Sequence, residues 1–370
     1  MYEEHAQTKL RDDEGPTKVL AMKPMEFAKV LHESKHKHGY HYWTSPLKDV
    51  APDVLSRLEG YESLHQDQRL LDPRGPSVWT GSCGSATQAH YDVADNVLVQ
   101  LFGSKRIRCY PPGSAEALHV FPDAHPRARK SQVDFDNPNH VRFPRFSSLP
   151  APFLDIVLRP GDAIQIPAFW FHHVENGRIP SRETTTSSSS KNPHQDIEGD
   201  SGDDGPSLSV NIFAMSLPMM AAQRVFQLAS RPFGIAKGTG SSFSASALRA
   251  LGAALVEGIG MEESVEHFVR RNLLESRYLP LQHGVAMAKG GDDSPSFISG
   301  RALTNAEGEA AQACVERLLP EFDYIQSVSD EADSDGILRL VALHLLELWA
   351  VELVGAKNVA NTWNAAISNA

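Results

Sequence analysis

The sequence predicts a mostly β protein whose core is an antiparallel barrel or sandwich, with a helical segment before it and a helical region after it. Between residues 77 and 216, short runs of alternating residues are separated by turn residues, without the helices that join parallel strands. After residue 217, apolar residues recur at helical spacing instead. The chain has 370 residues, 41% of them hydrophobic and 22% charged, which is enough to bury a sizeable core.

The first 76 residues divide into two parts. Residues 1–23 are polar and acidic, and we expect them to form a disordered tail. Residues 24–76 form an N-terminal flanking segment, in which Met25, Phe27, Val30 and Leu31 have the spacing of a short amphipathic helix.

The core, residues 77–216, contains two strand–turn–strand units. In the first, alternating residues at 97–101 and 106–109 flank Phe102-Gly103-Ser104-Lys105, as in a hairpin. In the second, residues 154–158 and 163–166 flank Pro160-Gly161-Asp162, and residues 208–213 add another strand. Residues 177–206 interrupt this pattern, because sixteen of the thirty are Gly, Pro, Ser or Thr and none is aromatic. We expect a disordered insertion there.

Residues 217–370 form the C-terminal helical region, with candidate helices at 219–228, 245–256, 265–274, 306–319 and 338–354. Val265, Phe268, Val269, Leu273 and Leu274 recur at helical spacing, so this stripe must be buried against something. It can pack on the chain's own barrel or against a second copy. We expect the second, a homodimer formed through the C-terminal helices.

Charge and composition exclude several classes of protein. The formal net charge of −11 excludes a histone-like binder of nucleic acid, although not a local basic patch. No run approaches the ~20 apolar residues of a membrane span, and the first residues lack the pattern of a secretory signal. The three cysteines are far apart and form no CxxC pair, which favours a reducing compartment. We expect a cytoplasmic or nuclear protein.

Two separated segments carry candidate metal ligands. His90 and Asp92 are two residues apart in an expected strand, so both side chains point to one face. The strand containing His172 and His173 returns 82 residues after His90, and alternation allows only one of these two histidines to share the site. Two histidines and one carboxylate are the facial ligand set of Fe(II) oxygenases. The alternative is a surface His–Asp pair and a histidine at a strand edge.

Lys105 follows His90 by fifteen residues. It is either a solvated lysine of a turn or a buried cation for the distal carboxylate of a dicarboxylate cosubstrate, where charge-assisted hydrogen bonds are strong. Thr87, three residues before His90, offers a hydroxyl to the same group.

These residues belong to a longer pattern that resembles the JmjC-domain Fe(II)/2-oxoglutarate oxygenases. The resemblance covers residues 77–216 and extends weakly to about residue 25. It rests on segments that occur in this order along the chain: Gly84-Ser85-Ala86-Thr87-Gln88-Ala89-His90-Tyr91-Asp92, Asn96, Gln100, Gly103, Lys105-Arg106, Pro111-Pro112, residues 131–138, Arg142-Phe143-Pro144, Pro160-Gly161-Asp162, Ile166-Pro167, Trp170-Phe171-His172-His173 and Val210-Asn211-Ile212-Phe213. It points to the small-hydroxylase branch that includes the tRNA wybutosine-synthesising hydroxylase and the asparaginyl hydroxylase of hypoxia signalling.

The resemblance implies a fold, a cofactor set and a reaction. The fold is a double-stranded β-helix, the jelly roll of cupins. The metal ligands would be His90, Asp92 and His172, and the residues that bind 2-oxoglutarate would be Lys105, Thr87, Tyr42, Asn96 and Asn211. Fe(II), 2-oxoglutarate and O2 would together hydroxylate a C–H bond and release succinate and carbon dioxide. No further catalytic residue is implied.

The residues of the sequence leave two substrate classes open, a tRNA and a protein. Arg129 and Lys130 stand where the asparaginyl enzyme has an Arg-Gln pair that binds the target amide, and a lysine supplies donors only. Arg127, Arg142 and Arg145 add to a local basic cluster that could meet phosphates, or be a solvated face. We favour a tRNA hydroxylase over a protein hydroxylase. A metal-free cupin that serves as a binding module is the third alternative.

Overall fold

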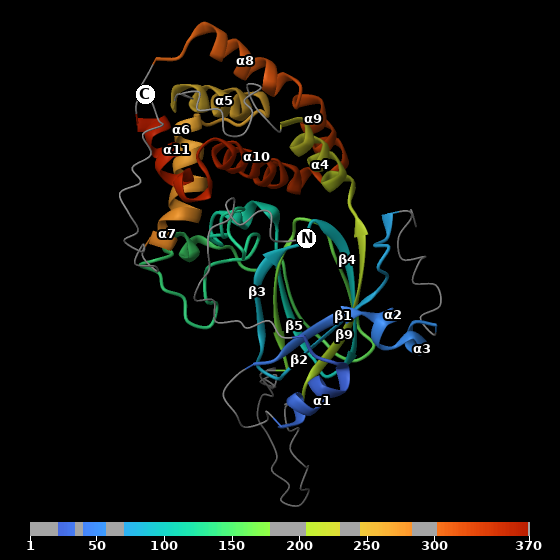
Figure 1. The fold of residues 1–370 in the computed structure, drawn as a ribbon. Helices are drawn as coiled ribbons and strands as arrows, with labels where there is room; N and C mark the ends of the chain where they lie inside the picture. The colour runs from blue at the N-terminus through green and yellow to red at the C-terminus, as the bar shows by residue number, and fades with distance from the viewer. Residues whose placement is uncertain are drawn as a thin grey trace, which may run out of the picture.

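The computed structural model describes residues 21–33, 40–56, 70–177, 205–229, 245–282 and 302–368. It consists of two antiparallel sheets that face each other, with a cap of helices at one end (Figure 1). The helices of the cap follow the strands in the chain and lie together on one side of them (Figure 1).

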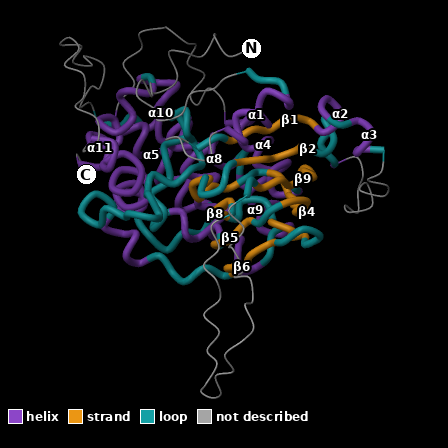
Figure 2. The backbone as a smooth tube through the Cα atoms, turned by 90° about the horizontal axis from the view of Figure 1, so that it is seen from below, coloured by secondary structure: helices purple, strands orange, loops and turns teal. Residues whose placement is uncertain are grey.

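One sheet has five strands and the other has four, and every strand pairs antiparallel with its neighbours. The first has the order β1 (Tyr42–Pro46), β2 (Ser77–Gly81), β9 (Ser207–Met215), β4 (Ala94–Phe102) and β7 (Ala163–Ile166). The second has the order β3 (Ala86–Tyr91), β8 (Phe171–Asn176), β5 (Lys105–Tyr110) and β6 (Leu154–Leu158). Figure 2 shows the strands gathered into one body beside the helices. The predicted jelly-roll core is confirmed, but helical residues outnumber strand residues in the described part of the chain, so "mostly β" understates the helices.

The predicted hairpin between residues 97 and 109 is wrong. Its two arms, β4 and β5, lie in different sheets, and the turn at Gly103 carries the chain from one sheet to the other. The turn at Gly161 does the same between β6 and β7. Both glycines have positive φ, +63° and +95°, a conformation that favours glycine. Alternation predicts a strand, but it does not identify the partner that the strand pairs with.

Three short helices flank β1, the edge strand of the five-stranded sheet, in the chain. The helix expected from residue 24 is α1 (Pro24–Glu33), and α2 (Leu47–Val50) and α3 (Pro52–Leu55) follow β1. Leu47 packs with Val78 and Val210 in a small core of its own. Two 3-10 turns, η4 (Pro112–Ala115) and η5 (Pro144–Ser148), lie in the long connection between β5 and β6.

The cap is built from helices on both sides of the long central helix α10 (Figure 1). Its elements are α4 (Leu217–Ala229), α5 (Ala245–Gly258), α6 (Val265–Phe268), the π-helix η7 (Val269–Tyr278), α7 (Leu279–Gln282), α8 (Asn305–Glu316), α9 (Leu319–Val328), α10 (Glu331–Val354), η8 (Ala356–Asn358) and α11 (Val359–Ser368). No helix in these described segments is both long and apolar enough to cross a membrane.

The helical stripe expected to form a dimer is buried inside a single chain. Val265, Phe268, Val269, Leu273 and Leu274 are 0–7% exposed, and they belong to one core cluster with α5, α10, α11 and aromatic residues of the barrel. The prediction that this stripe mediates self-association is therefore wrong, because its apolar surface is already covered.

Two other expectations fall largely outside the described residues. Of the expected disordered tail, residues 1–20 are not described, and of the expected insertion, residues 178–204 are not described. The insertion separates β8 from β9 in the chain.

Candidate active site

The two candidate histidine ligands face each other across a strand pair. β3 and β8 pair antiparallel, and His90 lies directly opposite His172 in the register. Side chains opposite each other in such a pair are close neighbours, and here the two imidazole centroids are 4.2 Å apart. The register therefore brings together two residues that are 82 positions apart in the sequence.

Asp92 completes a group of three. An irregularity in β3 between Thr87 and His90 shifts the register, and such bulges are frequent next to active sites. Asp92 follows the end of the strand, with one carboxylate oxygen 3.6 Å from Nε2 of His172. One potential ligand atom from each of His90, Asp92 and His172 lies within 4.8 Å of the others.

Both histidines are held with a ring nitrogen free for a metal. Nδ1 of His90 lies 2.9 Å from the Gln88 carbonyl, and Nδ1 of His172 lies 3.1 Å from the Trp170 carbonyl. A carbonyl only accepts, so each Nδ1 carries the proton and each Nε2 keeps its lone pair when the ring is neutral. Burial, helped by the neighbouring His172, lowers the pKa of His90 well below its usual range, which favours the neutral ring.

His173 points to the other side of the sheet. Its Nε2 lies 3.2 Å from a Glu175 carboxylate oxygen, and its ring stacks on Phe135 with centroids 4.5 Å apart. That bond, together with Arg108, lowers the pKa of Glu175 to about 2. The structure thus places His172, and not His173, beside His90 and Asp92.

The ammonium of Lys105 is buried inside the barrel. The residue is 2% exposed, and among the described residues its ammonium has no carboxylate partner. Its Nζ donates to Ser209 Oγ at 2.5 Å. Burial lowers the pKa of Lys105 to about 7. A buried ammonium without an anion is costly, so this position is suited to an anionic ligand.

A polar row continues from Lys105 along the inner face of β9. Ser209 Oγ donates to Asn211 Oδ1 at 3.4 Å, and Asn211 Nδ2 donates to Asn96 Oδ1 at 3.1 Å. These three side chains are 0–6% exposed. Ser209 was not among the predicted site residues. Its position two residues before Asn211 on one strand was the available signal, because such residues share a face.

Tyr42 and Thr87 meet at the rim of this interior. Tyr42 lies on β1 and is 43% exposed as a residue, but its hydroxyl end is buried and hydrogen-bonds the Thr87 side chain. Burial of the hydroxyl end, with a smaller effect of the Asp92 charge, raises the pKa of Tyr42 above its usual range. The hydroxyl is therefore protonated and able to donate. The structure brings the two residues together near Asp92.

The Arg129-Lys130 pair lies at the opposite edge of β3. Ser131 N donates to the Ala89 carbonyl at 2.7 Å and Tyr91 N donates to the Arg129 carbonyl at 3.3 Å, so this segment runs beside the His90 strand. Both residues are exposed to solvent, although the Lys130 ammonium is partly buried. Desolvation of its ammonium, followed by repulsion from Arg127 and Arg129, lowers the pKa of Lys130. The two cations are thus placed beside the candidate metal ligands.

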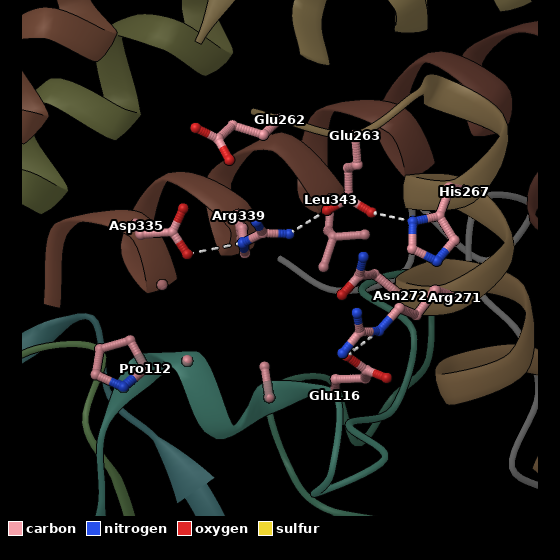
Figure 3. A pocket seen from close by; sticks show the side chains of 13 residues that line it. Pro112, Glu116, Glu262, Glu263, His267, Arg271, Asn272, Asp335, Arg339 and Leu343 are labelled. Carbon is pink, nitrogen blue, oxygen red and sulfur yellow. Dashed lines mark hydrogen bonds and ion pairs between the residues drawn. The ribbon is translucent and has the colours of Figure 1, made fainter. Parts of the chain in front are cut away.

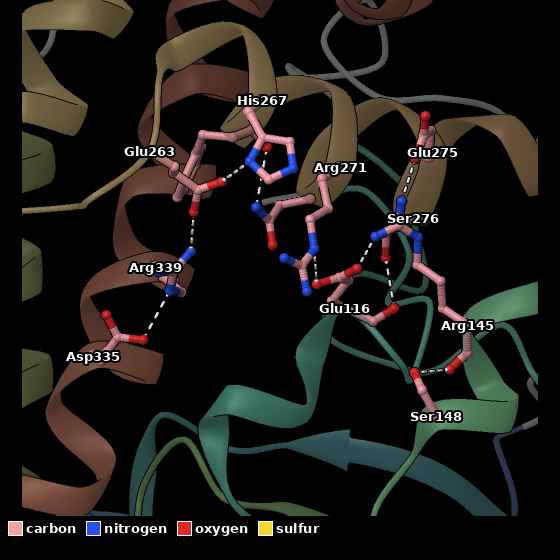
Figure 4. Close-up of polar contacts among 12 residues, drawn as sticks. Glu116, Arg145, Ser148, Glu263, His267, Arg271, Glu275, Ser276, Asp335 and Arg339 are labelled. Carbon is pink, nitrogen blue, oxygen red and sulfur yellow. Dashed lines mark hydrogen bonds and ion pairs between the residues drawn. The ribbon is translucent and has the colours of Figure 1, made fainter.

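Two arginines of the predicted basic cluster, Arg142 and Arg145, do not join them. Arg145 forms ion pairs with Glu116 and Glu275 (Figure 4). Arg142 donates to the Pro280 carbonyl at 2.9 Å. These contacts tie the β5–β6 connection to the helical cap. The expectation of five clustered cations free to meet phosphates is wrong for these two arginines.

A separate cleft of about 460 Å³ lies between η4 and the cap (Figure 3). Arg339 pairs with Glu263 and Asp335, and Arg271 pairs with Glu116 at 2.7 Å (Figure 4). The pairs of Arg339 lie within the cap, whereas the Arg271–Glu116 pair crosses from the cap to the β5–β6 connection. The cleft is thus lined by paired charges, and it contains none of His90, Asp92 and His172.

Residues 3–213 match the cupin-like domain family, and the chain belongs to that family because the match covers more than half of it. It is a cupin of the JmjC type, a group whose members are typically 2-oxoglutarate-dependent oxygenases.

Among its relatives, lysine-specific demethylase 8 of Xenopus tropicalis is 36% identical over 98 residues, which cover 26% of this chain and 21% of the relative. The tRNA wybutosine-synthesizing protein 5 of Homo sapiens is 38% identical over 165 residues, covering 38% of this chain and 47% of the relative. That of Danio rerio is 40% identical over 161 residues, covering 40% and 47%. The chain thus spans less than half the length of the curated relatives it matches.

Proposed function

We propose that this protein is an Fe(II)- and 2-oxoglutarate-dependent oxygenase that hydroxylates a C–H bond in a macromolecular substrate. One observation carries the proposal: His90, Asp92 and His172 converge in a barrel that also buries the Lys105 ammonium, which has no carboxylate partner among the described residues. Two histidines and one carboxylate suit Fe(II) and leave coordination positions open. A cupin that only binds other molecules would not need this combination.

The residues of the chain prepare the site for both groups. Nε2 of His90, Nε2 of His172 and a carboxylate oxygen of Asp92 would hold the metal. Bound iron supplies the O2 chemistry that couples the oxidation of 2-oxoglutarate to hydroxylation.

Lys105 would hold the distal carboxylate of 2-oxoglutarate through a charge-assisted hydrogen bond. Tyr42 and Thr87 would add hydroxyl donors at the rim, and Asn96 and Asn211 would line the interior nearby.

For the substrate we favour a tRNA. Arg129 and Lys130 present two exposed cations beside the metal ligands, and neither offers an acceptor to a target amide. Relatives named tRNA wybutosine-synthesizing protein 5 are 31–40% identical in the matching segment and match over 161–165 residues. A protein substrate, with side-chain hydroxylation of the asparaginyl type, is the second candidate. A protein substrate is favoured by relatives named lysine-specific demethylase, at 31–36% identity. A cytoplasmic or nuclear location stays a prediction.

The test is 2-oxoglutarate turnover by the purified protein with Fe(II) and ascorbate, measured as succinate, against a panel of tRNAs and peptides. We expect one class to stimulate succinate formation and to gain one oxygen atom by mass spectrometry. His90→Ala, Asp92→Ala and His172→Ala should abolish turnover, whereas the matched control His173→Ala should retain much of it. Turnover that survives His172→Ala and fails in His173→Ala would contradict the ligand assignment. Wild-type protein without turnover or metal binding would favour a non-catalytic cupin.

A further inference from the structure

A tight turn connects two of the three candidate metal ligands. In residues 167–170, Phe169 has a φ of +66°, which is uncommon for a residue other than glycine. Phe169 N donates to the Asp92 carbonyl at 2.7 Å. The next residue, Trp170, offers the carbonyl that accepts the Nδ1 proton of His172 at 3.1 Å. A displacement of this turn would therefore move Asp92 and rotate the His172 ring.

Two carboxylates outside the ligand set hold the turn. Asp95 Oδ1 accepts from Ala168 N at 2.9 Å, within the barrel itself. Asp333 Oδ2 accepts from Trp170 Nε1 at 2.6 Å, and it comes from helix α10 of the cap, 163 residues away in the sequence. Asp333 is 8% exposed. The indole ring also contacts Phe153 edge to face, with centroids 5.1 Å apart.

We propose that Asp333 is a positioning residue for the metal site, acting through Trp170 on His172. The hydrogen bond from the indole to Asp333 fixes the position of Trp170. The backbone carbonyl of Trp170 in turn fixes the tautomer and orientation of the His172 ring. A strained turn needs such external support, because an unusual φ persists only where the surroundings hold it. The cap thereby takes part in the geometry of the site. The inference rests on the proposed function only in requiring that the three ligands bind a divalent metal.

The test uses Co(II) alone as the probe, with the full-length chain. Losing a direct partner of a metal-bound histidine weakens metal binding by about 10–100-fold, so we expect about 5-fold weaker Co(II) binding in Asp333→Leu, one link further away. Its visible Co(II) absorption bands should shift, because the His172 ring changes orientation. Asp333→Asn keeps an oxygen that accepts from the indole and should restore both the affinity and the spectrum. Recovery by Asn distinguishes positioning from a general loss of stability.

Two further variants make the test decisive. Trp170→Phe removes the donor but keeps an aromatic ring against Phe153, so it should reproduce the shift, and combining it with Asp333→Leu should add little. Asp335→Leu is the matched control on the same helix, because its side chain is 66% exposed and pairs with Arg339 instead. Its affinity and spectrum should equal those of the wild type.

The possible outcomes separate the two proposals. Wild-type protein that does not bind Co(II) would contradict the metal site and the proposed function. Wild-type binding with unchanged affinity and spectra in both Asp333→Leu and Trp170→Phe would overturn the positioning role alone. If Asp333→Leu fails to fold, the comparison of Trp170→Phe with the wild type decides the question in the same way.

Discussion

Lys105 occupies an unfavourable position for a lysine in the free protein. Its ammonium is surrounded by the barrel interior, and its described polar partner is the neutral hydroxyl of Ser209. Such a residue destabilises the free fold and is compensated when an anion arrives, so it marks a ligand site more strongly than a surface cation would.

Replacing Lys105 should therefore have opposite effects on binding and on stability. Lys105→Met should raise the dissociation constant for 2-oxoglutarate by at least ~10-fold, because a charge-assisted hydrogen bond is worth roughly 1.5–3 kcal/mol. The ligand-free variant should melt no lower than the wild type. Anaerobic titration with Mn(II) present measures the affinity. Arg106→Met is the control, since Arg106 is on the outer face and pairs with Asp155. Equal affinities in the wild type and Lys105→Met would remove Lys105 from the pocket.

The same burial predicts a pH dependence of binding. Burial lowers the pKa of Lys105 to about 7, whereas an anion beside it would raise that pKa. Above pH 7 the free protein must therefore take up a proton to bind 2-oxoglutarate, and the dissociation constant should increase by up to about tenfold per pH unit. In Lys105→Met the binding curve should be flat between pH 7 and 8.5. A flat curve in the wild type would show that the lysine is already charged.

At the scale of the elements, two glycine turns move the chain between the sheets. A Cβ on Gly103 would lie 2.3 Å from the Pro206 carbonyl oxygen, whereas a Cβ on Gly161 would meet nothing within 4 Å. Both have positive φ. At both positions a residue other than glycine would be strained by the positive φ, but only at Gly103 would its Cβ also clash with the neighbouring backbone.

Substitution by alanine should separate these two costs. Gly161→Ala should lower the free energy of unfolding by about 1 kcal/mol from strain alone, within the 1–3 kcal/mol expected of such conformations. Gly103→Ala should cost more, because β9 must also move away from the turn that precedes Lys105. Urea unfolding measures both values. Equal losses would mean that the Pro206 contact relaxes without cost.

Sequence periodicity predicts the strands of this fold better than their partners. In β4, alternation is clear, yet the inward face carries Asn96, Leu98 and Gln100 while Val97 and Val99 remain half exposed. A polar interior reverses the usual relation between hydrophobicity and burial, so alternation alone does not identify the inner face.

The candidate ligands were predictable because His90 and Asp92 are two residues apart in an expected strand and so share a face, and because the family pattern indicated His172. Their mutual distance depends on the pairing of β3 with β8. The hydrogen bond from Trp170 to Asp333 had no local signal, since it depends on how the cap packs.

At the scale of the whole molecule, a buried group of charges joins the cap to the barrel. Arg277 of η7 donates to Asp123 at 2.9 Å and to Glu347 of α10 at 2.7 Å, and Glu347 also accepts from Asp123 N at 2.7 Å. Arg277 and Glu347 are each 1% exposed. Asp123 belongs to the connection that returns as Arg129-Lys130 beside His90. Hydrogen bonds therefore join the cap to Asp123, and the chain leads directly from Asp123 to the residues beside His90.

The carboxylates of this group are not equivalent. Burial disfavours the charged form of Asp123, but Arg277 and His344 outweigh it and hold the pKa of Asp123 below its usual range. Burial and the neighbouring Asp123 charge raise the pKa of Glu347 to about 7. The two pKa shifts run in opposite directions, so the negative charge that pairs with Arg277 is favoured on Asp123 over Glu347.

Removing the arginine should show how strongly the cap is attached. Arg277→Met should lower the free energy of unfolding by about 3–5 kcal/mol, because it leaves Glu347 and Asp123 buried with only the His344 imidazole to offset their charge. Arg271→Met, six residues earlier, is the control: its side chain is 49% exposed beside Glu116, so its loss should cost no more than ~1 kcal/mol.

The stability lost in Arg277→Met should also depend on pH. Without Arg277 the pKa of Asp123 must rise, so the folded variant gains protons and relative stability as the pH falls. The difference in unfolding free energy from the wild type should therefore shrink between pH 7 and pH 4. Chemical denaturation at both pH values measures this, and a difference that grows toward acid would contradict the assignment of the charge to Asp123.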